Sequence, residues 1–236
     1  MNAATTVGKL VVERPGRARV LERLGLDYCC GGGKSLSESC QDLGLDVEVV
    51  LRDIAKSDAA SPGNDAANPA DLTLTQLADQ IEATHHAYLR LELPRISGLA
   101  GKVAQAHGEN HPQTHQVQRV FEALRTELEA HMQKEEVILF PMCRQLEGSS
   151  EVPAFHCGSL RNPIAVMEHE HDNAGRALAE MRKLTADYAT PPDVCNTYRA
   201  LMDALAGLEA DLHQHIHKEN NILFPRTVEL EARLAA

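Results

Sequence analysis

The chain has 236 residues, enough for one large domain or for a large domain with a small one. Its formal charge of −11 argues against nucleic acid or an anionic membrane surface as the main partner. No apolar run reaches the roughly 20 residues of a membrane span, and no stretch resembles a signal peptide, so we expect a cytoplasmic protein. Aromatic residues make up only 3% and Trp is absent, a composition that favours packed helices over sheets.

Residues 1–56 are expected to form a small helical domain, near the lower size limit for independent folding. Three short helices are predicted in it, one after Pro15, one from Ser35 and one from Asp46. The second has a capping-box signature, because Glu38 follows Ser35 by three residues.

Residues 57–71 are small, polar and interrupted by Pro and Gly, and this composition is typical of a linker. Four long helical patterns follow within residues 72–236. We expect helices over about Thr73–Leu93, Thr114–Phe140, Pro163–Tyr188 and Val194–Phe224. Pro94 is expected to end the first helix, and Pro141 is compatible with a kink or an end of the second. Short connections favour antiparallel neighbours, so the fold class is all-α, an up-down-up-down four-helix bundle.

Two stretches of the second and fourth helices repeat one pattern, His-x-x-x-Glu, four residues, then Phe-Pro. They run from His131 to Pro141 and from His215 to Pro225, with a shift of 84 positions. A single His-x-x-x-Glu pair is common on solvated helix faces, where it adds little stability. Here, however, each pair lies on the apolar stripe of its helix, where a carboxylate without a cation would be costly. The pattern therefore predicts a metal site formed by His131, Glu135, His215 and Glu219, in which bridging carboxylates favour two metal ions.

The first helix of each hairpin should supply a further ligand, but the repeat does not choose it. His85 and His86 are available in one hairpin, and His169 and His171 in the other. An offset of 84 pairs His85 with His169, whereas an offset of 85 pairs His86 with His171. Both alternatives stay open at this level.

Six cysteines are present, and none forms a Cys-x-x-Cys motif. Cys29 and Cys30 are adjacent and precede three glycines, an arrangement compatible with a reactive thiol site or with buried thiols beside a turn. Cys143 and Cys195 are expected to pack as small apolar residues. His213 and His217 flank His215 and are expected to be solvated.

Four motifs follow one another along the chain. They are Asp27-Tyr-Cys29-Cys30-Gly-Gly, His131-x-x-x-Glu135 with Leu139-Phe-Pro, Glu170-His171-Asp-x-Ala-Gly, and His215-x-x-x-Glu219-Asn-Asn with Leu223-Phe-Pro. Taken together and in this order, they resemble the RIC ("repair of iron centres") family over nearly the whole chain. The resemblance implies a hemerythrin-like bundle that follows a small Cys-Cys domain. It also implies a non-haem centre of two iron ions, bridged by carboxylates and an oxygen species. The implied ligands are His86, His131, Glu135, His171, His215 and Glu219.

The same resemblance implies repair of iron–sulfur clusters damaged by nitric oxide or oxidative stress, by iron donation or by handling of nitric oxide. Damaged iron–sulfur proteins would be the partners, nitric oxide or O2 the small ligand, and Cys29 and Cys30 the catalytic thiols. His107 corresponds to an auxiliary histidine, and Glu170 is placed to shape access. The alternatives are a hemerythrin-like carrier or sensor of O2 or nitric oxide, or a nitric oxide reductase. Whether the protein is an enzyme stays open, and a homodimer is compatible with the sequence.

Overall fold

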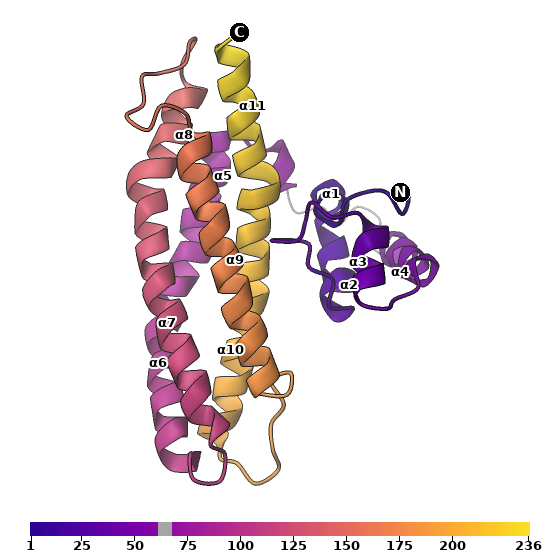
Figure 1. The fold of residues 1–236 in the computed structure, drawn as a ribbon, viewed down its shortest axis with the longest axis vertical. Helices are drawn as coiled ribbons and strands as arrows, with labels where there is room; N and C mark the ends of the chain where they lie inside the picture. Colours follow the sequence, from indigo (N-terminus) through magenta and orange to yellow (C-terminus); the bar gives the residue numbers. More distant parts are fainter. Residues whose placement is uncertain (61–67) are drawn as a thin grey trace. The chain divides into compact units, whose positions relative to one another are not determined.

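The computed structural model describes residues 1–60 and 68–236, and its regular elements in these ranges are helices (Figure 1). The described residues contain no β-strand beyond an isolated bridge between Thr6 and Ser35. In the same ranges no helix has the length and apolar character needed to cross a membrane. The predicted all-α class is confirmed.

The N-terminal helices are α1 (Val7–Glu13), α2 (Ala18–Arg23), α3 (Leu36–Asp42) and α4 (Val47–Ala60). Helices α2 to α4 correspond to the three predicted ones, whereas α1 was not predicted. Its signals are nevertheless present, since the Thr6 side chain caps the Lys9 N–H and Val7, Leu10 and Val11 are buried on one side. These residues contribute to an apolar core shared by all four helices.

The capping box at the start of α3 is confirmed. The Ser35 hydroxyl accepts a hydrogen bond from the Glu38 N–H at 3.2 Å, and the Ser35 N–H donates to the Glu38 carboxylate at 2.9 Å. Two backbone N–H groups that the helix leaves without partners are thereby satisfied.

A buried arginine joins the first turns of this domain to α4. Arg17 is 7% exposed, and its guanidinium donates to Asp58 at 2.8 Å, to Glu13 at 3.0 Å and to the Leu10 carbonyl at 3.1 Å. The Arg17 guanidinium holds the pKa of the Asp58 carboxyl below its ordinary value. The pair therefore stabilises the folded state while Asp58 is ionised.

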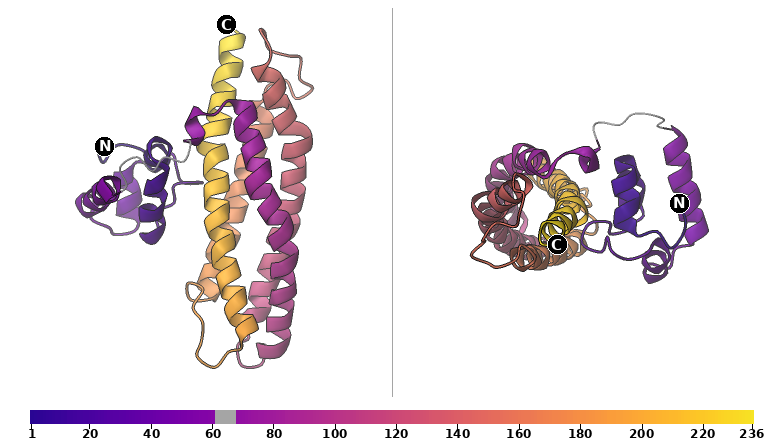
Figure 2. Two further views of the ribbon diagram at one scale, coloured as in Figure 1. Left: turned by 180° about the vertical axis from the view of Figure 1, so that it is seen from behind. Right: turned by 90° about the horizontal axis from the view of Figure 1, so that it is seen from above.

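The bundle is formed by α6 (Ala87–His107), α7 (Gln113–Lys134), α9 (Arg161–Leu184) and α10 (Asn196–Lys218). Leu89 of α6, Phe121 of α7, Leu178 of α9 and Leu208 of α10 belong to one continuous apolar core. Seen from above, the four helices are arranged around a common centre (Figure 2). The predicted up-down-up-down four-helix bundle is confirmed.

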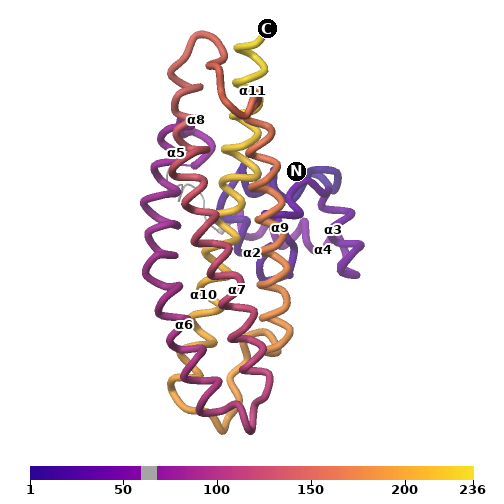
Figure 3. The backbone as a smooth tube through the Cα atoms, turned by 60° about the vertical axis from the view of Figure 1, so that its left-hand side comes forward, coloured from indigo at the N-terminus to yellow at the C-terminus, as the bar shows by residue number. Residues whose placement is uncertain are grey.

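Three of the long helical runs contain a π-helical segment. These segments are Glu82–His86 between α5 (Leu74–Ile81) and α6, Glu135–Leu139 between α7 and α8 (Phe140–Glu147), and Glu219–Leu223 between α10 and α11 (Phe224–Leu234). The Phe140 N–H bonds to the Glu135 carbonyl and the Phe224 N–H to the Glu219 carbonyl, five residues back in each case. The backbone therefore continues as a helix through each segment (Figure 3).

The expected helix end at Pro94 is wrong, because Pro94 lies inside α6. Leu93 and Ile96 on either side of it are 1% and 0% exposed, so burial of this face offsets the hydrogen bond that proline cannot donate. The helix predicted over Thr114–Phe140 likewise continues through Pro141 to Glu147, and the last one continues to Leu234.

The chain divides into two compact units, residues 1–78, 146–153 and 213–236, and residues 79–145 and 154–212. The predicted domain limits at 56 and 71 stay a prediction. Helix α4 extends to Ala60, into the predicted linker, and residues 61–67 of that linker lie outside the described residues.

Replacing Asp58 by Asn should lower the free energy of unfolding by about 1–3 kcal/mol, because the buried Arg17 then keeps only Glu13 of its two carboxylate partners. Urea unfolding measured by circular dichroism tests this. The folded-state pKa of Asp58 is depressed, so its contribution is complete above about pH 5 and shrinks as the pH falls below the ordinary pKa near 4.

The matched control is Asp53→Asn on the same helix, since the ion pair of Asp53 within the described residues is with the exposed Lys56, at 3.3 Å. Its effect should stay below about 0.5 kcal/mol. Equal losses in the two variants, or a difference between wild type and Asp58→Asn that grows in acid, would contradict the role of the Arg17–Asp58 pair.

Candidate metal centre

Glu135 is fully buried at the first position of its π segment, and its two oxygens face two different imidazoles. Oε1 lies 3.2 Å from Nε2 of His131, one turn earlier on α7, and Oε2 lies 3.3 Å from Nε2 of His86. The His86 ring stacks on Phe140 of the repeated Phe-Pro pair, with centroids 5.8 Å apart. A carboxylate that presents each oxygen to a separate imidazole has the geometry of a bridge between two metal ions.

Helix α9 contributes His171, which is 2% exposed. Its Nε2 lies 3.1 Å from Nε2 of His131, and the two ring centroids are 4.8 Å apart. Two imidazole nitrogens directed at one point are the arrangement expected of two ligands of the same ion.

The second copy of the repeat forms the same local pair. Nε2 of His215 lies 3.0 Å from Oε1 of Glu219, and the two side chains are 1% and 0% exposed. Glu219 opens its π segment as Glu135 opens the corresponding one.

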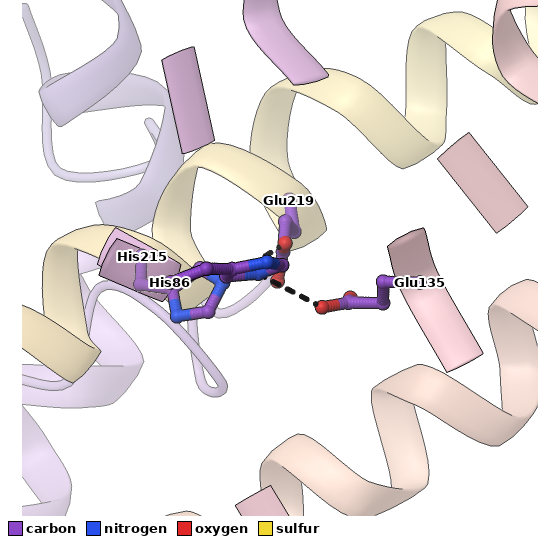
Figure 4. A group of neighbouring side chains, drawn as sticks. All are labelled: His86, Glu135, His215 and Glu219. Atoms are coloured by element: carbon purple, nitrogen blue, oxygen red, sulfur yellow. Dashed lines mark hydrogen bonds and ion pairs between the residues drawn. The ribbon is translucent and has the colours of Figure 1, made fainter. Parts of the chain in front are cut away.

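The candidate ligand atoms fall into two groups, within each of which all atoms lie within 4.8 Å of one another. One group contains His86, Glu135, His215 and Glu219, and the other contains His131, Glu135, His171 and Glu219. Figure 4 shows the four side chains of the first group directed toward one another. Glu135 and Glu219 belong to both groups, so each group has two imidazoles of its own and two shared carboxylates.

This donor set suits a non-haem di-iron centre. Imidazole and carboxylate are common ligands of iron, and two shared carboxylates hold two cations close together. Two buried carboxylates at this separation would repel each other without cations between them. Four histidines and two glutamates do not fill two octahedral coordination shells, so positions remain for small ligands.

Outer carboxylates contact the far side of two of these imidazoles. Nδ1 of His86 lies 2.7 Å from Glu136, and Nδ1 of His131 lies 2.8 Å from Glu170. Such contacts fix the ring orientation and the tautomer of a metal-binding histidine and increase its basicity. Burial pushes the pKa of Glu170 upward, but hydrogen bonds from Lys134 and His131 outweigh it and lower that pKa, so Glu170 stays ionised beside His131.

Glu136 was not predicted from the sequence, although it directly follows the ligand candidate Glu135. Glu170 contacts His131, and its expected role in shaping access stays a prediction.

The structure separates the alternatives that the repeat left open. His86 and His171 belong to the two groups. His85 is buried elsewhere, with Nδ1 2.8 Å from Asp211, and His169 is exposed. The assignment of the six ligands remains a prediction, now supported by the placement of their ligand atoms.

Cys29 and Cys30 lie in a loop organised by Asp27. Oδ1 of Asp27 accepts hydrogen bonds from the N–H groups of Cys29 and Cys30 at 2.9 and 3.0 Å. The two sulfur atoms are 3.9 Å apart; Cys29 is buried and Cys30 is half-buried. The hydrogen bond with Cys30 and burial raise the pKa of the Cys29 thiol well above its ordinary value, so Cys29 is a protonated thiol at neutral pH.

This loop contacts the helical run that carries His215 and Glu219. The Asn221 amide donates to the carbonyls of Tyr28 and Cys29 at 3.3 and 3.1 Å. A Cβ atom at Gly32 would come within 2.4 Å of the Asn221 side chain, so the close approach requires glycine there. The Cys-Cys loop is thus attached two residues beyond Glu219.

The expectation that His217 is solvated is wrong, because its side chain is buried. Its Nδ1 lies 3.3 Å from the Tyr28 carbonyl, and burial lowers its pKa to about 4. His213 is half-buried against the Tyr28 ring, with centroids 6.2 Å apart. Cys143 is buried, in agreement with the expectation that it packs as a small apolar residue. The same expectation is wrong for Cys195, which is exposed and contacts His107.

Comparison with known proteins agrees with this geometry. Residues 77–227 match the hemerythrin HHE cation binding domain, and residues 3–58 match a domain of unknown function, DUF542. The chain is 35% identical to the iron–sulfur cluster repair protein YtfE of Pectobacterium carotovorum over 223 residues, 94% of this chain and 96% of the relative. It is 35% identical to the protein of that name from Escherichia coli O157:H7 (94% and 96% covered) and 34% identical to that of Musicola paradisiaca (96% and 97% covered).

These matches confirm the resemblance drawn from the motifs and cover both the bundle and the Cys-Cys segment. The chain therefore belongs to the hemerythrin HHE cation-binding family and, within it, to the RIC family of iron–sulfur cluster repair proteins.

Proposed function

We propose that this protein uses a di-iron centre to repair iron–sulfur clusters damaged by nitric oxide or oxidative stress. The observation that carries the proposal is the pair of ligand groups that share Glu135 and Glu219. Its relatives, matched over nearly their whole length, are named as iron–sulfur cluster repair proteins, and this supports the choice among di-iron functions.

The six proposed ligands are His86, His131, Glu135, His171, His215 and Glu219. When bound, iron supplies open coordination positions for nitric oxide or O2 and is itself available for donation to a damaged cluster. The chain holds the ligand side chains in a buried setting, and Glu136 and Glu170 orient two imidazoles through their Nδ1 atoms.

Cys29 and Cys30 are the proposed catalytic thiols, which engage the damaged iron–sulfur protein or accept a sulfur-bound species from it. The half-buried Cys30 is the accessible member of the pair. Free thiols at all six cysteines suit a reducing compartment, so we propose a cytoplasmic location. A homodimer is compatible with this function.

A second function, reversible binding of O2 or nitric oxide by a carrier or sensor, is favoured by the same buried ligand groups, which need no cysteine. Nitric oxide reduction is a further variant of this chemistry. The double variant Cys29→Ser, Cys30→Ser separates the two functions, because a carrier keeps its function and a repair protein of the proposed kind loses it.

The iron-loaded protein should restore activity to a [4Fe–4S] enzyme inactivated by nitric oxide. His131→Ala should lose this ability, because His131 contacts both Glu135 and His171. The matched control is His169→Ala, an exposed histidine on α9 outside both groups. Failure of the wild-type protein to restore activity beyond the His131→Ala level would refute the repair function.

Glu170→Gln should weaken iron binding by about 10- to 100-fold, because His131 loses the carboxylate that orients it. Competition with a chromogenic iron chelator measures the affinity. Glu168→Gln, an exposed position two residues earlier on α9, serves as the control and should bind as the wild type does. Equal affinity of the two variants would mean that Glu170 does not support a ligand.

Removal of iron should lower the melting temperature by about 5 °C or more, because bound cations stabilise the folded state and offset the repulsion between Glu135 and Glu219. Scanning calorimetry with and without a chelator tests this, and iron added back should restore the original value. The same treatment should change the melting temperature of His131→Ala less, because this variant lacks a ligand of one of the two groups. An unaltered wild-type melting temperature would argue against buried ligation.

A further inference from the structure

An exposed cysteine and a histidine from two different helices meet away from the proposed iron ligands. Cys195 directly precedes α10, and His107 is the last residue of α6. Nε2 of His107 lies 3.1 Å from Sγ of Cys195. Contact within hydrogen-bonding distance between a thiol and an imidazole is the arrangement of an activated sulfur nucleophile and its base.

Neighbouring side chains hold the imidazole in place. The Tyr198 ring contacts His107 edge-on, with centroids 5.5 Å apart, and contacts the His111 ring at 5.7 Å. His111 in turn lies 3.3 Å from the exposed carboxylate of Asp193. Among the described residues, the titratable groups near the thiol are therefore His107, His111 and Asp193, and the Tyr198 ring contacts both imidazoles.

The backbone adds to this environment. The Cys195 carbonyl accepts bonds from the N–H groups of Tyr198 and Arg199, so Cys195 occupies the capping position of a 23-residue helix. The N–H groups at such an end favour a negative charge. The hydrogen bond with His107, followed by that with the Tyr198 N–H, lowers the pKa of the Cys195 thiol to about 7.

We propose that Cys195 and His107 form a reactive thiol site that exchanges with low-molecular-weight disulfides. The Cys195 thiol transfers its proton to His107, and the thiolate attacks one sulfur of the disulfide. A new S–S bond forms at Cys195 while the S–S bond of the small molecule breaks. The leaving thiolate takes the proton from His107, so the step needs no further oxidant.

Two features favour this chemistry over a structural contact. The sulfur is exposed, so a small disulfide can approach it from solvent. An attacking thiol exchanges best when its pKa lies near the ambient pH, because a more basic thiol is protonated and a more acidic one is a poorer nucleophile. The product would be a mixed disulfide at the capping position of α10.

The test is the reaction of the full chain with limiting 5,5′-dithiobis(2-nitrobenzoate), followed by mass spectrometry of each cysteine peptide. Cys195 should react at least about tenfold faster than the half-buried Cys157 at pH 7. His107→Gln should slow Cys195 by about tenfold and move the midpoint of its pH profile toward the ordinary value near 8.5. His115→Gln, an exposed histidine on α7, is the control.

Wild-type reactivity in His107→Gln, or a Cys195 that reacts no faster than Cys157, would overturn the proposal. The wild-type pH profile decides the matter even if the variant folds poorly. A midpoint near pH 7 supports the site, and a midpoint near 8.5 refutes it.

Discussion

Two carboxylates without solvent exposure, Glu135 and Glu219, impose the main constraint on this molecule. A charge in an apolar bundle is tolerated only where cations or donors balance it. The surrounding features fit this requirement: imidazoles next to both carboxylates, shared membership of two ligand groups, and outer carboxylates behind His86 and His131. The bundle is therefore a scaffold whose core is divided between apolar packing and a polar centre.

The Cys-Cys loop and the ligand helix also depend on each other locally. Asn221 holds the carbonyls of Tyr28 and Cys29, and its own position is set by the π segment that Glu219 opens. A change in that segment would displace both the Glu219 carboxylate and the Cys-Cys loop. In this way one short stretch of backbone serves the proposed iron centre and the proposed thiol chemistry.

Much of this arrangement was predictable because it is local. His131 with Glu135, and His215 with Glu219, lie one helical turn apart, and the capping box at Ser35 spans three residues. The choice of His86 over His85 was not predictable from the repeat. The reason is that the two hairpins are not exact copies of each other. Their connections, residues 108–112 and 185–195, differ in length, and a π segment precedes α6 whereas α9 is an uninterrupted α-helix. His217 was misjudged because its partner Tyr28 lies 189 residues away.

The π segments have a consequence for the phase of the helices. One residue corresponds to about 100° of rotation in an α-helix, so a single extra residue turns everything beyond it relative to everything before it. In the run from α7 to α8, the π segment lets Glu135, Phe140 and Cys143 all be buried. A uniform α-helix would turn Phe140 and Cys143 to a different angle about the helix axis relative to Glu135. Deleting one residue from Val137 or Ile138 would restore the α-helical phase. It would keep every proposed ligand in the sequence but rotate α8 relative to α7. The spacing between Glu135 and the Phe-Pro pair is therefore as much a part of the site as the ligands themselves.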